Sequence, residues 1–156
     1  MKTAITLTTC TLTLLTALLS TFSANEVRAA EFLNRPGEEA LNLPFSDAVR
    51  VGNLLILSGK LGTLPGTMKL APGGIKAEAR QTMENIKASL EAYGSGMEDV
   101  VKCTVMMADI DEWSAFNEVY VTYFPGPKPA RSAFEAAGLA LGGRLEVECW
   151  AEVPEA

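Results

Sequence analysis

Apolar segments of strand character alternate with two segments of helical periodicity, and this order constrains the fold more than any other feature of the chain. Strand segments span residues 49–51, 54–58, 100–108, 130–136 and 145–151, and helical segments span 75–93 and 113–123. The order β-β-α-β-α-β-β predicts a two-layer α+β domain, in which two helices cover one face of a mixed sheet. Since no third helix is available for the other face, we also expect an oligomer that packs sheets together.

Turn residues, helix-end residues and apolar spacing support these secondary-structure predictions. Gly52-Asn53 separates two apolar runs, which is typical of a two-residue hairpin. The first helix carries one apolar stripe at helical spacing, made of Ala79, Met83, Ile86, Leu90 and Tyr93. Gly94 ends this helix, and either Asp109 or Asp111 can cap the second one. Residues 59–74, which are rich in glycine, are predicted to form a long loop.

Composition excludes several kinds of chemistry. The chain has 156 residues, enough for one domain with a core, and it contains no histidine. Ser-His and Cys-His nucleophile pairs and His-rich catalytic zinc sites are therefore excluded. The three cysteines lack C-x-x-C spacing, so we expect no structural metal either. A net charge of −6 without a basic run argues against binding to nucleic acid.

Arg131 is the residue that most needs an explanation. It follows a proline-rich loop and opens the apolar strand segment 130–136, while Glu146 lies in the last strand segment. Charged groups on apolar strands are costly to bury unless something pairs with them. The planar N–H fork of arginine suits a carboxylate, whether it belongs to the protein or to a ligand. The residues alone therefore leave two interpretations open: a structural Arg131–Glu146 ion pair, or a site that binds an acid.

The first 29 residues have the pattern of a secretory signal peptide. Lys2 precedes an apolar stretch over residues 4–19, and small residues follow at 23–24 and 29–30. Cleavage near residue 24 or 29 would leave a domain of about residues 30–156 in the periplasm or outside the cell, without a membrane anchor. The alternatives are an uncleaved anchor, or a mistaken start codon and a cytoplasmic protein.

Two cysteines remain after such a cleavage, Cys103 and Cys149, each inside an apolar strand segment. They can pair in an oxidising compartment. Cysteines within strands more often act as small buried hydrophobes, however. We therefore expect these two to be unpaired.

Seven segments, in their order and spacing, resemble the RidA family, also called YjgF/YER057c/UK114 or, in older usage, endoribonuclease L-PSP. The resemblance runs from about residue 32 to residue 153. Each segment is weak evidence by itself, and the ordered set is specific. The segments are residues 42–45, 51–59, 79–87, 99–105, 116–120, 129–132 and 145–148.

The resemblance implies both a fold and a reaction. The family has a chorismate-mutase-like α+β domain that forms a homotrimer, with active sites in the clefts between subunits. Its best-known members hydrolyse reactive 2-enamines and 2-imines to 2-oxo acids and ammonia, without a metal or an organic cofactor. The implied partner is thus a small 2-imino or 2-oxo acid. A non-catalytic trimer that binds small carboxylates is the alternative, and a ribonuclease is disfavoured by the negative charge and the missing histidine.

The resemblance also assigns roles to individual residues. Arg131 matches the arginine that binds the substrate carboxylate, a contact that suits its planar fork. Glu146 matches an acidic residue near the imine, where it can position water or carry a proton. Asn117 matches a polar residue of the pocket, although a solvent-facing helix asparagine is the alternative. Glu148 shares a strand face with Glu146, and we expect a structural or solvated role for it.

Three further residues complete the expected substrate-binding set. Ser58 lies in the matching segment 51–59. Phe45 stands where the deaminase branch of the family commonly has a tyrosine, so a phenol hydroxyl is missing. Ala133 stands where that branch commonly has a cysteine, a loss that hydrolysis without a nucleophile tolerates. These two departures leave the preferred substrate open.

Overall fold

The computed structural model describes residues 29–36 and 43–155. The predicted signal peptide falls almost entirely on residues 1–28, which lie outside the described residues. Within the described part, no helix is both long and apolar enough to cross a membrane.

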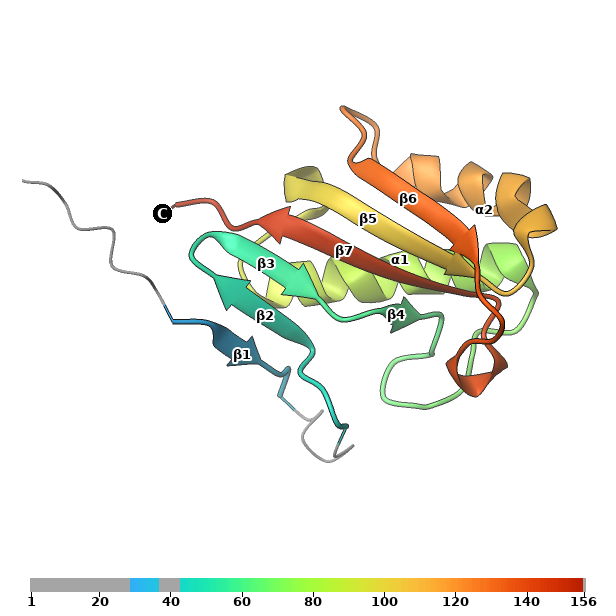
Figure 1. Cartoon of the computed structure of the whole chain (residues 1–156), viewed down its shortest axis with the longest axis horizontal. Coiled ribbons are helices and arrows are strands. Elements are labelled where there is room, and N and C mark those ends of the chain that lie inside the picture. The colour runs from blue at the N-terminus through green and yellow to red at the C-terminus, as the bar shows by residue number, and fades with distance from the viewer. Residues whose placement is uncertain (1–28, 37–42, 156) are drawn as a thin grey trace, which may run out of the picture.

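One seven-stranded mixed sheet forms the first layer, and the strand order is β1-β2-β3-β7-β5-β6, with β4 also paired to β7 (Figure 1). β5 and β6 are parallel, and every other neighbouring pair is antiparallel. The strands are β1 (Glu31–Leu33), β2 (Ala48–Val51), β3 (Leu54–Leu57), β4 (Lys60–Leu61), β5 (Val100–Met107), β6 (Ala130–Glu135) and β7 (Leu145–Glu152).

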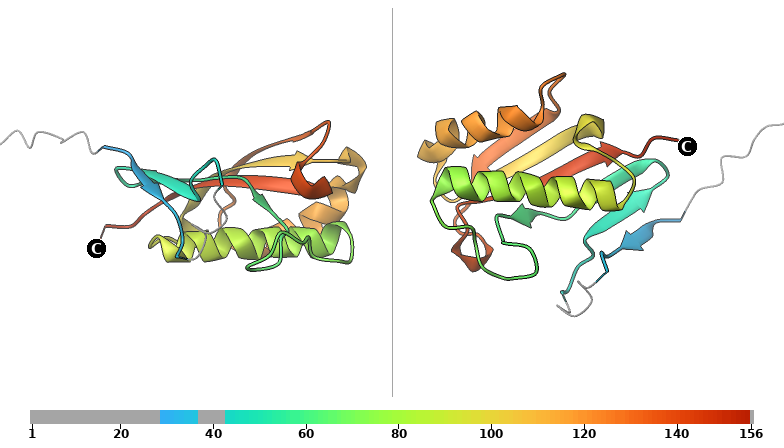
Figure 2. Two further views of the ribbon diagram at one scale, coloured as in Figure 1. Left: turned by 90° about the horizontal axis from the view of Figure 1, so that it is seen from below. Right: turned by 180° about the vertical axis from the view of Figure 1, so that it is seen from behind.

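Helices α1 (Ile75–Ala92) and α2 (Trp113–Tyr120) form the second layer, and both lie on the same face of the sheet (Figure 2). In the described part of the chain, short 3-10 helices occur in the connections: η2 (Met97–Asp99), η3 (Ile110–Glu112), η4 (Val121–Tyr123) and η5 (Ala140–Gly142). The predicted two-layer α+β fold is therefore confirmed. Strands β1 and β4 were not predicted, because segments of three and two residues are too short to show an alternating pattern.

Helix α1 buries the stripe that its sequence predicts. Ala79, Met83, Ile86 and Leu90 are fully buried against the sheet. The hairpin between β2 and β3 also forms as predicted, and Gly52 occupies its turn with a φ of 63°, a left-handed conformation that glycine adopts without steric cost. Patterns of local residues thus account for both elements.

Among the residues that the structure describes, no helix covers the opposite face of the sheet (Figure 2). Along β7, Leu145, Val147 and Cys149 are buried beneath the helices, whereas the alternate residues point to the uncovered face. Large apolar side chains are exposed on this second face, including Phe32 at 73%, Phe134 at 49% and Trp150 at 38%. An apolar face of this kind is consistent with the expected oligomer.

Cys103 and Cys149 form a disulfide, which corrects the expectation that both are unpaired. The two residues are directly opposite each other on the antiparallel strands β5 and β7, with Cα atoms 4.1 Å apart. Both side chains are fully buried on the helix face. The sequence shows that each cysteine lies in a strand, but it does not show the strand register that brings the two together.

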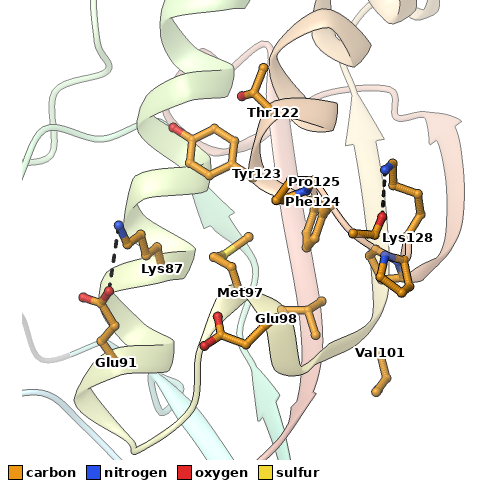
Figure 3. Close-up of a pocket in the computed structure, with 14 residues that line it drawn as sticks. Lys87, Glu91, Met97, Glu98, Val101, Thr122, Tyr123, Phe124, Pro125 and Lys128 are labelled. Carbon is orange, nitrogen blue, oxygen red and sulfur yellow. Dashed lines mark hydrogen bonds and ion pairs between the residues drawn. The ribbon is translucent and has the colours of Figure 1, made fainter.

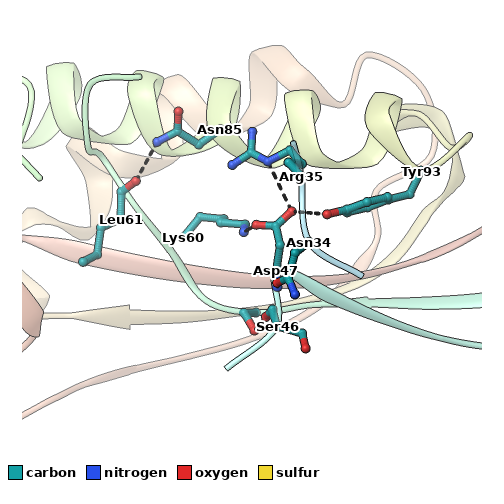
Figure 4. A network of polar contacts seen from close by, with 9 residues as sticks. Asn34, Arg35, Ser46, Asp47, Lys60, Leu61, Asn85 and Tyr93 are labelled. Carbon is teal, nitrogen blue, oxygen red and sulfur yellow. Dashed lines mark hydrogen bonds and ion pairs between the residues drawn. The ribbon is translucent and has the colours of Figure 1, made fainter. Parts of the chain in front are cut away.

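A buried carboxylate ties the β1 side of the sheet to the end of α1 (Figure 4). The Asp47 side chain is only 4% exposed, and Lys60 forms an ion pair with its Oδ1. Tyr93 donates a hydrogen bond to Oδ2 over 2.9 Å, and the Arg35 Nε lies 3.3 Å from the same oxygen. Burial by itself would raise the pKa of Asp47, but the charge and hydrogen bond of Lys60, helped by Tyr93 and Arg35, hold that pKa below its ordinary value.

We predict that Asp47→Asn destabilises the fold by about 3 kcal/mol, because it leaves two partly buried cations without their anion. The low folded-state pKa of Asp47 also means that its contribution is present above about pH 4 and is lost as the pH falls through that pKa. Urea unfolding at pH 7 and at pH 3 measures both effects, and the difference between variant and wild type should shrink at the lower pH.

Glu118→Gln is the matched control, since it removes a carboxylate from an exposed ion pair with Lys76. This change should cost less than about 1 kcal/mol. Equal effects of the two substitutions would show that the Asp47 network does not stabilise the fold.

Candidate active site

Arg131 is half-buried on β6, the edge strand of the sheet, and its side chain lies on the helix face. Its guanidinium carbon is 4.5 Å from the ring centroids of both Trp113 and Tyr120, and 5.8 Å from that of Phe116. Its Nη1 donates a hydrogen bond of 2.8 Å to Oδ1 of Asn117. Asn117 therefore faces the candidate site, and its alternative role as a solvent-facing residue is wrong.

Within the described residues, no carboxylate lies within ion-pair distance of Arg131, so the structural Arg131–Glu146 pair is wrong. The strand register gives the physical reason. Arg131 is opposite Cys103, which is itself opposite Cys149, so these three side chains lie on the helix face. Glu146 is three residues before Cys149 on β7, an odd number, and its side chain therefore points to the other face.

Glu146 packs over the backbone of Gly59. A Cβ atom at position 59 would lie 1.9 Å from Oε1 of Glu146, so a side chain at this position would displace the carboxylate from its place over Gly59. Burial raises the pKa of Glu146, and the negative charge of Glu148 raises it further. Glu148 lies on the same face, as alternation predicts, and accepts a hydrogen bond of 3.0 Å from Nε1 of Trp150.

Ser58 directly precedes Gly59, over which Glu146 packs, and Phe45 directly precedes Ser46, a hydrogen-bond partner of Ser58. The backbone N–H of Ser58 donates to the carbonyl of Asp47 over 3.0 Å, and its hydroxyl donates to the carbonyl of Ser46 over 2.7 Å. Ser58 is thereby fixed directly before Gly59. Phe45 is 55% exposed, which leaves its ring available to a ligand or to another chain.

The six predicted site residues thus fall into two groups. The arginine group consists of Arg131, Asn117 and Ala133, and Ala133 follows Arg131 by two residues on the same face of β6. The glutamate group consists of Glu146, Ser58 and Phe45. Because Arg131 and Glu146 point to opposite faces of the sheet, one chain does not bring the two groups together.

Sequence reasoning missed the aromatic residues around Arg131. Trp113, Phe116 and Tyr120 lie within the predicted helical segment 113–123, where their periodicity indicates an apolar helix face, and Phe116 and Tyr120 are buried. Their spacing of three and four residues along α2 was the available signal. That signal does not reveal that the stripe also contacts a charged side chain from a strand.

A hollow of about 680 Å³ lies between the end of α1, η2 and the proline-rich segment before β6 (Figure 3). Its lining includes Met97, Tyr123 and Phe124, with Lys87 and Glu91 on the α1 side. None of the six predicted site residues lines it. In the part of the chain that the structure describes, no cluster of three or more metal-ligating side chains occurs.

The fold and the arginine group define a class of protein: a two-layer α+β domain whose half-buried guanidinium lies against aromatic rings without a carboxylate partner among the described residues. Comparison with known proteins narrows the class, since the family model Endoribonuclease L-PSP matches residues 37–153. A 2-iminobutanoate/2-iminopropanoate deaminase from Capra hircus is 46% identical over 105 residues, which are 67% of this chain and 77% of that protein. The chloroplastic Reactive Intermediate Deaminase A of Arabidopsis thaliana is 37% identical over 127 residues, 81% of this chain and 67% of its own length.

Solved structures agree with this match. RidA from an Antarctic Psychrobacter bacterium has a TM-score of 0.69 and 38% identity, covering 81% of this chain and 98% of that one. The YjgF gene product of E. coli has a TM-score of 0.68 and 32% identity, covering 79% of this chain and 94% of that one. The chain therefore belongs to the RidA family, whose older description is endoribonuclease L-PSP.

We predict that Glu146→Gln unfolds at a higher temperature than the wild type at pH 7. A raised folded-state pKa means that ionised Glu146 is disfavoured by folding, so its unfavourable effect develops as the pH rises above the ordinary carboxyl value and is complete once the pH exceeds the raised pKa. The advantage of the variant should therefore shrink as the pH falls toward the ordinary carboxyl value of 4.5. Thermal unfolding followed by circular dichroism across this pH range measures the effect.

Glu152→Gln removes a carboxylate from the same strand and the same face, and it serves as the control with little change expected. If Glu146→Gln lowers the melting temperature at pH 7, the ionised carboxylate stabilises the fold and the raised pKa is wrong.

Proposed function

We propose that this protein hydrolyses 2-enamine and 2-imine acids to 2-oxo acids and ammonia. Water adds to C2 of the protonated imine, the C2–N bond then breaks, and the water oxygen becomes the new keto oxygen. One imino acid and one water thus give one oxo acid and one ammonia, while an enamine first takes a proton at C3. The names of relatives at 37% and 46% identity support this reaction.

The single observation that carries the proposal is that Arg131 has no carboxylate partner among the described residues. The guanidinium contacts aromatic rings and donates to one neutral amide, so its charge has no nearby counter-ion among the described residues. Its remaining N–H groups suit the carboxylate that every 2-imino acid carries. A substrate held in this way presents C2 beside its anchored carboxylate.

Glu146 is suited to the proton transfers. A carboxyl group with a raised pKa keeps its proton closer to neutral pH, where it can protonate the imine nitrogen or the departing amine. Its conjugate base can then accept a proton from the attacking water. General acid–base catalysis of this kind typically contributes about 10²–10⁴-fold.

We also propose that the complete site forms between two chains of a homotrimer, with the arginine group from one chain and the glutamate group from its neighbour. Two observations support this assembly. Arg131 and Glu146 lie on opposite faces of the sheet within one chain, and the face without helices exposes Phe32, Phe134 and Trp150. Packing such faces together removes apolar surface from water.

The mature protein, we propose, acts in the periplasm or outside the cell. The Cys103–Cys149 disulfide supports this location, because disulfides persist in oxidising compartments and are rare in the cytosol. The signal-like pattern of residues 1–29 is an independent argument from the sequence.

We predict that Arg131→Ala lowers kcat/KM for a 2-imino acid by about a hundredfold or more, because charge-assisted hydrogen bonds to the carboxylate are lost. The assay couples the protein to threonine dehydratase, which generates the imine, and follows release of the 2-oxo acid. Arg131→Lys keeps the charge without the planar fork and should fall between the alanine variant and the wild type.

Arg80→Ala is the control, since Arg80 is an exposed arginine on α1. The kcat/KM of this variant should equal that of the wild type. Wild-type rates in Arg131→Ala would contradict the proposed site. Saturable binding of 2-oxobutanoate without turnover of any imine would contradict the proposed deaminase activity. It would show instead that the protein is a non-catalytic binder of small carboxylates.

The proposed location outside the cytoplasm can be tested through the disulfide. The full chain produced in a bacterium should be recovered from the periplasm with its Cys103–Cys149 pair closed, as thiol titration of the denatured protein measures. Closing a loop with a sequence separation of 46 should stabilise the fold by about 4 kcal/mol in the loop-entropy relation. The Cys103→Ala/Cys149→Ala variant should lose this stability with or without reductant. Recovery of reduced protein from the cytoplasm would contradict the proposed location.

A further inference from the structure

Three aromatic residues of α2 form a surface against which the Arg131 guanidinium lies, and we name Trp113, Phe116 and Tyr120 the aromatic seat. The guanidinium carbon is 4.5 Å from the Trp113 and Tyr120 centroids and 5.8 Å from that of Phe116. Neighbouring rings of the seat also contact each other, with centroids 6.3 Å apart for Trp113 and Phe116 and 5.4 Å apart for Phe116 and Tyr120. The seat is therefore one packed unit.

The groups that hold Arg131 determine whether its N–H donors remain free to bind a ligand. A carboxylate holds a guanidinium by its in-plane N–H groups and uses them up. An aromatic ring attracts the cation through the negative potential of the ring face and uses no N–H donor. Contact with the seat thus restrains Arg131 while the edge of its fork stays available.

Asn117 lies on the same helix, between Phe116 and Tyr120, and supplies the directional contact. Its Oδ1 accepts one hydrogen bond from Nη1 over 2.8 Å. This bond sets the rotation of the fork, and the neutral amide does not cancel the charge. Restraint by rings and an amide therefore differs from an ion pair, because the full positive charge is preserved for a ligand.

We propose that Trp113 and Tyr120 are positioning residues that pre-organise Arg131 for the substrate carboxylate. This inference deepens the proposed function and rests on it. Neither residue needs to touch the reacting atoms, since each acts through the arginine. Loss of a ring frees the guanidinium to adopt other orientations, and binding of the acid then has to restrict it again.

The Tyr120 hydroxyl provides an internal control. Tyr120 is 4% exposed, and its oxygen has no hydrogen-bond partner among the described residues. The proposal assigns the role to the ring alone. Tyr120→Phe should therefore retain acid binding, whereas Tyr120→Leu, which removes the ring, should weaken it.

The test measures the Kd for 2-oxobutanoate by calorimetry, together with KM and kcat in the coupled imine assay. Trp113→Leu and Tyr120→Leu should each raise Kd and KM by about tenfold, within the range expected for loss of one desolvated cation–π contact. The value of kcat should change much less, because the reacting groups are intact. The ring-preserving variants Trp113→Phe and Tyr120→Phe should restore most of the affinity.

Tyr123→Leu removes an aromatic ring from the adjacent η4 turn, and this ring has no cation–π contact with Arg131, so its Kd should stay at the wild-type value. Leucine variants that bind like the wild type would overturn the inference while leaving the proposed function intact. A loss of melting temperature without a change in Kd would likewise assign the seat to core packing alone. A wild type that neither binds the acid nor releases oxo acid would overturn the function and the inference together.

Discussion

The alternation of side chains across β5, β6 and β7 determines where every candidate group lies. Cys103 is in register with Arg131 on one side and with Cys149 on the other, so all three point toward the helices. Glu146 precedes Cys149 by an odd number of residues and therefore points away. One geometric rule thus places the disulfide in the core, brings Arg131 to α2, and separates the guanidinium from the carboxylate that would otherwise neutralise it.

Arg131 and Glu146 consequently each lie in surroundings that provide no partner of opposite charge among the described residues. Arg131 is restrained by rings and an amide, neither of which cancels its charge. Glu146 lies over Gly59 beside Glu148, and burial and the neighbouring charge raise its pKa. Structural charges usually occur in pairs, as Asp47 and Lys60 do elsewhere in this chain. Arg131, by contrast, has no carboxylate partner among the described residues, and this difference from the Asp47 network supports the proposed role of Arg131 in binding an acid.

Much of the fold could be predicted from local patterns. The stripe of α1, the Gly52-Asn53 turn and the apolar runs of β5 and β7 each depend on neighbouring residues, and each forms as expected. The disulfide was mispredicted, and the choice between an Arg131–Glu146 ion pair and an acid-binding site stayed open, for a shared reason. Both depend on strand register and on which face a residue occupies. Similarly, the contact of Arg131 with Trp113 and Tyr120 joins a strand to a helix, and no periodicity within either element reveals it.

The claim that the two groups meet across a subunit boundary can be tested by complementation. Arg131→Ala and Glu146→Gln are purified separately, unfolded, mixed in equal amounts and refolded together. In a closed ring assembled at random, each interface has a chance of about one in four of combining an intact arginine group with an intact glutamate group from its neighbour. We expect the mixture to recover about a quarter of the wild-type deaminase activity. A mixture no more active than the two variants refolded separately would contradict the account.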